Sequence, residues 1–208
     1  MNFGNDSLQL NRLTRRSSQN CVFPKIINDS KIDFYYVTEP DRMSKEKPIL
    51  TKKTLVYKFG DFVEYNKNPG NYDIEKIEYQ TSMCFGTCPK FHLDIADNRK
   101  AIFNAENYNR ETRESKEIQG KFETTINVKE YHQLVDLLNY INFPNLKDNY
   151  AVSWTDDQSC TLRITYNNGK TKEIKDYGLI GTYGLDRLYQ LLFELRFNQD
   201  WRKNYYYM

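Results

Sequence analysis

The stretch CTLRITYNNGKTKEIKDY, residues 160–177, carries the clearest structural signal in this sequence. Leu162, Ile164 and Tyr166 alternate with polar residues, which is the pattern of a strand with one buried face. Asn168 and Gly169 tolerate the positive φ angles of a type I′ turn, and a second strand-like run follows them. The stretch therefore predicts a β-hairpin with one face against a core.

A similar pattern occurs earlier, at residues 90–106. Phe91, Leu93 and Ile95 alternate with polar residues, and the Asp-Asn turn after them leads into a second run, so a hairpin is expected here too. Residues 73–81 and 120–126 also alternate and predict one strand each.

Each hairpin is followed by the pattern of an amphipathic helix. Asn127 and Glu130 form an asparagine version of the capping box at the start of the first helix, and Pro144 closes it. The apolar stripe of the first helix comprises Val128, Tyr131, Leu134, Val135, Leu138 and Ile141. The stripe of the second comprises Leu185, Leu188, Leu192 and Leu195, with Tyr189 beside it and an end near Asn198.

The hairpin-then-helix order occurs twice, and CPKFHLDIADNRKAIF (residues 88–103) is echoed by SCTLRITYNNGKTKEI (residues 159–174). Either the two halves are a pseudo-repeat, or they match because amphipathic hairpins resemble one another. In both cases the pattern predicts an α+β two-layer sandwich, in which a mostly antiparallel sheet is covered on one face by two helices.

We assign this α+β domain to residues 73–203. Residues 1–72 are interpreted as an N-terminal extension, partly ordered, with short strands at residues 31–37 and 54–65, the latter split at Gly60. Residues 204–208 form a tyrosine-rich tail, and tyrosine suits recognition surfaces.

The composition of the chain limits the classes of partner that the sequence predicts. The 208 residues carry 30 basic and 28 acidic side chains, a formal charge of +2, which does not predict a nucleic-acid partner. No run of about eighteen apolar residues predicts a transmembrane segment. No secretory signal is legible, so a cytoplasmic location with free thiols at the four cysteines is expected, and an envelope or periplasmic one if a leader is missing from this chain.

CFGTCPKFHLDI (residues 84–95), KDNYAVSWTDDQS (residues 147–159) and DYG (residues 176–178), with Trp201 beyond, resemble the bacterial family known as domain of unknown function 6438. The likeness covers about residues 74–202. The family-like positions are Cys84, Gly86, Cys88, Pro89, Tyr150, Thr155, Asp156, Tyr177 and Trp201. The resemblance implies a small accessory domain and brings no activity, although members commonly look like exported or lipid-anchored envelope proteins.

Cys84 and Cys88 allow three interpretations. A zinc site would need more ligands, such as His92 and Cys160, and a thioredoxin-type site would need two cysteines three residues apart at a helix start. The favoured interpretation is a structural turn. In it Gly86 supplies an unusual φ and Pro89 fixes the exit, while the thiols pack or form a short-loop disulfide in an oxidising compartment. No metal or cofactor is expected.

Asp156 and Asp157 lie close to Tyr150 and Trp154. On an extended strand the two carboxylates would point to opposite faces, so loop hydrogen bonding is expected rather than acid–base chemistry, unless the segment is a turn. If Asp156 lay beside the cysteine loop, a shared pocket would follow. Gly178, Gly181 and Gly184 match no phosphate-binding motif and are interpreted as a flexible entry to the last helix.

These observations predict a non-enzymatic module that binds a protein or peptide. The expected binding residues are Cys84, Gly86, Cys88, Pro89, Tyr150, Trp154 and Asp156. The alternative is a thiol- or zinc-dependent enzyme centred on the cysteine loop.

Overall fold

The computed structural model of the chain describes residues 21–38, 47 and 49–204. The chain divides into two compact units, the first made of residues 1–67 with 182–184 and the second of residues 68–181 with 185–208. The beginning of the predicted extension and most of the tyrosine-rich tail lie outside the described residues.

The first unit contains a four-stranded antiparallel sheet in the order β1-β2-β3-β4. Its strands are β1 (Cys21–Asn28), β2 (Lys31–Thr38), β3 (Ile49–Lys58) and β4 (Asp61–Glu64). The predicted split at Gly60 is found, because Phe59 and Gly60 adopt positive φ angles of 59° and 82° between β3 and β4. A small core of Ile32, Phe34, Leu55, Phe62 and Tyr183 shows more order than the predicted short strands imply.

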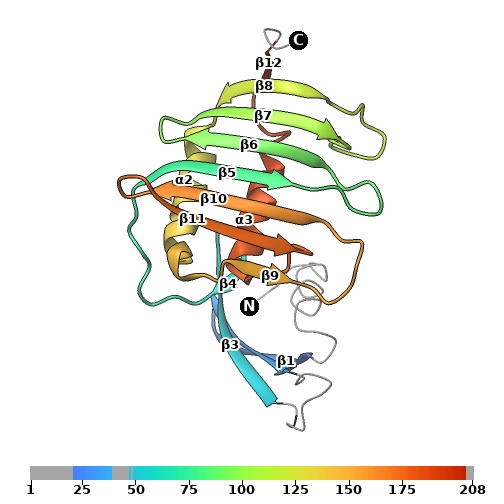
Figure 1. The fold of residues 1–208 in the computed structure, drawn as a ribbon. Helices are drawn as coiled ribbons and strands as arrows, with labels where there is room; N and C mark the ends of the chain where they lie inside the picture. The colour runs from blue at the N-terminus through green and yellow to red at the C-terminus, as the bar shows by residue number, and fades with distance from the viewer. Residues whose placement is uncertain (1–20, 39–46, 48, 205–208) are drawn as a thin grey trace. The chain divides into compact units, whose positions relative to one another are not determined.

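The second unit is an eight-stranded sheet in the order β12-β8-β7-β6-β5-β10-β11-β9 with two helices on one face (Figure 1). The strands are β5 (Ile74–Thr81), β6 (Lys90–Ala96), β7 (Lys100–Asn107), β8 (Gly120–Thr125), β9 (Asn149–Ala151), β10 (Ser159–Tyr166), β11 (Lys170–Tyr177) and β12 (Arg202–Lys203). The helices are α2 (Val128–Tyr140) and α3 (Tyr183–Glu194), with a 3₁₀ turn η1 (Phe143–Asn145). The predicted α+β sandwich is therefore confirmed.

Strand β5 pairs with β6 on one side and with β10 on the other, so the two predicted hairpins flank it. Every strand pair of this sheet is antiparallel except β9 with β11. The β10–β11 turn differs from the prediction, because three residues connect the strands, with φ angles of 46°, 65° and 80° at Asn167, Asn168 and Gly169. The Glu75 carboxylate accepts hydrogen bonds from the N–H groups of Asn168 and Gly169, which holds this longer turn against β5.

The core lies between the sheet and the helices. Alternate residues of the central strands, such as Ile77, Leu93 and Leu162, are fully buried, and so is the predicted leucine stripe of α3. The predicted stripe of α2 is wrong at Val128, which is 48% exposed. Val128 lies six residues before the buried Leu134, which places it about 120° away around a helix with 3.6 residues per turn.

The start of α2 is capped in an unexpected way. The Asn127 side chain accepts a hydrogen bond from the N–H of Lys129, as an N-cap should. The Asn127 N–H donates to Gln199 Oε1 at 2.8 Å. Gln199, and not Glu130, therefore accepts the hydrogen bond that the predicted capping box assigns to the residue at the third helical position. At the other end Asn142, with φ 52°, ends the helix just before Pro144.

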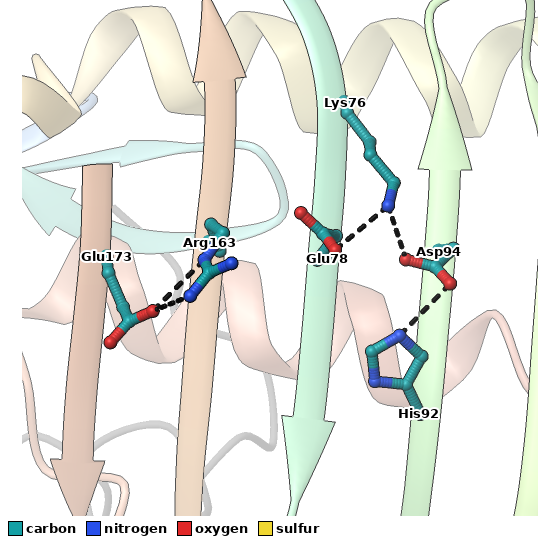
Figure 2. A network of polar contacts seen from close by, with 6 residues as sticks. All are labelled: Lys76, Glu78, His92, Asp94, Arg163 and Glu173. Atoms are coloured by element: carbon teal, nitrogen blue, oxygen red, sulfur yellow. Dashed lines mark hydrogen bonds and ion pairs between the residues drawn. The ribbon is translucent and has the colours of Figure 1, made fainter. Parts of the chain in front are cut away.

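The sheet face opposite the helices is polar and carries a network of ion pairs (Figure 2). Lys76 Nζ lies 2.9 Å from Glu78 Oε1 and 3.1 Å from Asp94 Oδ1, so one cation separates two carboxylates that face each other across β5 and β6. His92 Nε2 lies 3.1 Å from the other Asp94 oxygen. This hydrogen bond raises the pKa of His92, against the opposing effect of burial.

Burial alone would raise the pKa of Asp94, but the hydrogen bonds from His92 and Lys76 outweigh it and hold that pKa below its usual range. On the same face, Arg163 Nε donates to Glu173 Oε2 at 3.0 Å. The open face is thus neutralised internally over β5, β6, β10 and β11.

Neither helix in the described part of the chain has the length and hydropathy that a membrane span requires.

Candidate functional site

Cys84 and Cys88 form a disulfide, with Cα atoms 5.6 Å apart, in the loop between β5 and β6. The expectation of free thiols is therefore wrong for these two cysteines, and the short-loop disulfide is found instead. The chain folds back at Gly86, whose N–H donates to the Cys84 carbonyl at 2.9 Å and whose φ is 157°. This tight turn brings the two Cα atoms within the range that a disulfide needs.

Two buried polar side chains clamp the base of the disulfide loop. Thr81 Oγ1 donates to the Pro89 carbonyl at 2.7 Å and accepts from the N–H of Phe91. Gln158 Nε2 donates to the carbonyls of Ser82 at 3.0 Å and Pro89 at 2.7 Å, so one side chain holds both ends of the loop. Gln158 is only 7% exposed. Sequence reasoning missed it, because nothing in its spacing distinguishes it from an ordinary loop glutamine.

The segment at residues 152–158 is a bend, not an extended strand, and Asp156 has a left-handed φ of 71°. It contacts the disulfide loop directly, since the Phe85 N–H donates to the Asp156 carbonyl at 3.2 Å. The Asp157 carboxylate accepts from Trp154 Nε1 at 3.0 Å and from the N–H of Gln158 at 2.8 Å. Asp156 therefore lies beside the cysteine loop, and Asp157 has the predicted loop hydrogen-bonding role.

One tyrosine hydroxyl ties this bend to the sheet edge, and a second accepts a hydrogen bond from the segment just before β9. Tyr177 accepts a hydrogen bond on its hydroxyl from the N–H of Asp157 at 3.1 Å. Tyr150 lies in β9, next to β11, and its hydroxyl accepts from the N–H of Lys147. Gly178 lets the chain pass close to Val152, because a Cβ at position 178 would lie 2.6 Å from a Val152 methyl carbon.

The remaining family-like positions have local roles. Trp201 packs on Phe103 with ring centroids 5.3 Å apart, and its Nε1 donates to the Leu195 carbonyl at 2.8 Å. Trp201 therefore belongs to the packing between the sheet and α3, and Thr155 lies within the bend, where its hydroxyl contacts the Asp156 carboxylate.

Three large apolar side chains project from these two segments. Met83 is 51% exposed, Phe85 is 90% exposed and Trp154 is 57% exposed. We call Met83, Phe85 and Trp154 the disulfide-loop surface. Met83 and Phe85 were missed from sequence, although Phe85 is an apolar residue between two closely spaced cysteines, and Met83 directly precedes the first of them.

The residues that the alternative zinc site would need are not brought together. Cys84 and Cys88 are oxidised, and His92 bonds Asp94 on the open face of the sheet. Cys160 is buried on the helix-covered face, where it lies opposite Thr81. Within the described ranges no three His, Cys, Asp or Glu side chains are grouped as metal ligands.

A buried polar cluster lies behind the site. Burial raises the pKa of the Cys160 thiol to about 12, and the nearby Asp176 carboxylate acts in the same direction. Asp176 is buried and accepts hydrogen bonds from the N–H groups of Ile180 at 2.9 Å and Gly181 at 2.8 Å. The glycine-containing segment before α3 therefore wraps around a carboxylate of the protein itself.

A separate hollow of about 1030 Å³ lies on the open face of the sheet, near β12. It is lined by charges of both signs, including Lys100, Glu123, Asp200 and Arg202, and by none of the predicted binding residues.

The fold and the site together define a class: an α+β two-layer domain with a disulfide-closed loop at the end of its central strand. The family follows from comparison with known proteins. Residues 75–196, more than half of the chain, match the family model described as Domain of unknown function (DUF6438), and the chain belongs to this family. Comparison with curated proteins and with solved structures gives no match.

Proposed function

We propose that this domain is a non-enzymatic module that binds a protein or peptide through the disulfide-loop surface. The observation that carries the proposal is Phe85, a phenylalanine that is 90% exposed and lies between the two cysteines of a disulfide-closed loop. Large aromatic side chains at the centre of a contact are the residues that most often dominate binding energy.

Burial of the disulfide-loop surface by a partner would be energetically favourable. Burying one such apolar side chain stabilises a complex by about 1.5–3 kcal/mol, and the surface offers Met83 and Trp154 beside Phe85. Contiguous exposed apolar side chains often mark interaction sites, and these three lie on two segments that touch through a backbone hydrogen bond.

The loop is also held in one shape before any partner arrives. The Cys84–Cys88 disulfide closes it, and Gln158 bonds both of its ends. A preorganised loop loses less conformational entropy on binding, which leaves more of the contact energy for affinity.

The disulfide also supports a proposal about location. Disulfides persist in oxidising compartments and are rare in the cytosol. We therefore favour an exported or envelope location over the cytoplasmic one.

The proposal can be tested by site-specific photo-crosslinking in the source cells. A photoreactive phenylalanine analogue at position 85 should capture a discrete partner, and excess unlabelled wild-type protein should compete for it. A Phe85→Ala/Trp154→Ala variant should compete at least about tenfold less well, since it lacks two anchors.

The matched control places the same analogue at position 128, because Val128 is an exposed apolar residue (48%, close to Met83 and Trp154) that lies on α2, outside the surface. The proposal fails if positions 85 and 128 capture the same proteins, or if the double variant competes as well as the wild type.

A further inference from the structure

We infer that the partner presents a basic segment, whose arginine or lysine side chains lie against Phe85 and Trp154 and pair with Asp156 and Asp157. This inference rests on the proposed function and adds the chemistry of the partner to it.

Two aspartates are hydrogen-bonded to residues of the disulfide-loop surface. Asp156 is in backbone contact with Phe85, since the Phe85 N–H donates to the Asp156 carbonyl at 3.2 Å. Asp157 holds the Trp154 indole through a hydrogen bond of 3.0 Å from Nε1. Each of the two aromatic residues is therefore hydrogen-bonded to an aspartate, Phe85 through the backbone and Trp154 through its indole.

No described residue forms an ion pair with either of these two carboxylates. Among the residues that the structure describes, no Lys, Arg or His nitrogen lies within ion-pair distance of either carboxylate, whereas Glu78, Asp94 and Glu173 on the open face are all paired. The known partners of Asp156 and Asp157 are neutral hydroxyl, indole and amide groups. A cationic partner would supply the missing charge.

Aromatic rings beside carboxylates suit a guanidinium or ammonium group in two ways. The cation is attracted to the face of a Trp or Phe ring, and its N–H groups form charge-assisted hydrogen bonds with a carboxylate. Arginine combines both, because its planar group stacks on a ring while it donates from its edge. The same carboxylates would repel nucleic-acid phosphates and anionic lipid headgroups, so a basic polypeptide is the partner that fits.

The test uses the full chain and a fluorescent probe peptide in which arginine and leucine alternate. Two analogues replace every arginine by glutamine or by glutamate. We expect the arginine peptide to bind, with an affinity that falls as salt is added, and the glutamine and glutamate analogues to bind more weakly.

The decisive variant is Asp156→Asn/Asp157→Asn, which removes the two charges while asparagine tolerates the left-handed φ at position 156. It should bind the arginine peptide about tenfold more weakly, the loss expected for two charged contacts at a partly exposed site. The matched control, Asp97→Asn/Asp136→Asn, removes the same number of charges from the β6–β7 turn and from α2 and should stay within about twofold of the wild type, since charges outside the contact act only through screened long-range forces.

The inference is overturned if the arginine peptide does not bind, if the glutamine analogue binds equally well, or if the two double variants bind alike. Phe85→Ala separates this failure from that of the proposed function. A photo-crosslinked partner that depends on Phe85 but shows no preference for basic probes would preserve the binding function and reject a basic partner. If capture of the partner depended neither on Phe85 nor on basic residues in the probe, both the proposed binding function and the basic partner would be rejected.

Discussion

Gly178 shows how a single residue sets the geometry of the site. It has a φ of 89°, and a Cβ there would lie 2.6 Å from a methyl carbon of Val152. Its N–H donates to the Gln158 carbonyl at 2.8 Å, so the start and the end of the bend that carries Trp154 meet at this glycine. A side chain at position 178 would therefore push the bend away from the sheet edge.

We predict that Gly178→Ala lowers the free energy of unfolding by about 1–3 kcal/mol more than Gly169→Ala does. Both glycines have a positive φ, so both substitutions carry a similar backbone cost. A methyl group at position 169 would have no atom within 4 Å, whereas one at position 178 would clash with Val152. Urea denaturation of the two variants measures the difference, and equal losses would show that Val152 moves away freely.

Among single residues, the sequence predicted those that shape a turn better than those whose role depends on exposure or on a contact with a distant segment. Gly86 and Pro89 were correctly interpreted as parts of a structural turn. Phe85 and Gln158 were not identified, because exposure and a bridge between two distant carbonyls depend on which segments become neighbours. Cys84 and Cys88 were expected to be reduced, since compartment was judged from the N-terminus and not from loop geometry.

Strands β5 and β6 carry the charged network on the open face of the sheet. Glu78 and Asp94 are register partners, and like charges directly opposite each other on a sheet are unfavourable. Lys76 lies within 3.1 Å of both, and His92 adds a second donor to Asp94. The pair of strands therefore depends on two nitrogen groups, one of them the imidazole of His92, whose pKa is raised by its hydrogen bond to Asp94.

We predict that His92 stabilises the fold at mildly acidic pH and loses this effect as the pH rises. The pKa of His92 in the folded state is raised above its ordinary value of 6.5, so the protonated form favours folding. The contribution is fully present below the ordinary pKa and disappears as the pH rises through the raised one. The Asp94 contribution has the opposite sign, because its lowered pKa makes it present above the ordinary value of 3.8 and lost in acid.

The measurement is the difference in unfolding free energy between the wild type and His92→Gln, at about pH 5.5 and about pH 8.5, on either side of the ordinary histidine pKa. The difference should be larger at the lower pH, by less than about 1 kcal/mol because the pair is partly exposed. Asp94→Asn should remove this pH dependence of the His92→Gln effect. A difference that is the same at both pH values would contradict the prediction.

Long periodic elements were predicted well, and short ones were not. The strands from β5 to β8 and the leucine stripe of α3 follow from alternation and from helical spacing. Strands β9 and β12 have three and two residues, which is too short for a period to be visible. The cap of α2 was predicted at Asn127, but its partner Gln199 is 72 residues away, so no local motif reveals it.

For the molecule as a whole, the chain was predicted as one α+β domain with a partly ordered extension. The first unit proves to contain a four-stranded sheet with a core of its own. Its strands are rich in Lys, Thr and Tyr and bury few side chains, so the usual alternation is weak and the sequence suggested less order than is present.

We predict that residues 68–208 fold without the preceding segment. The second unit has its own core between eight strands and two helices, and cores of this kind support independent folding. The fragment should show a single cooperative thermal transition and a well-dispersed amide spectrum. A fragment that lacks a cooperative transition would show that the first unit is needed for folding.

The two edge strands of the eight-stranded sheet affect how readily the domain can aggregate at high protein concentration. β9 and β12, the outermost strands, contain three and two residues. A strand this short offers an incoming chain almost no template of free backbone groups, and short edge strands are one of the ways in which natural sheets avoid fibril growth. The eight-stranded sheet can therefore carry an exposed phenylalanine in its disulfide loop while its own two edges offer little backbone on which a fibril could grow.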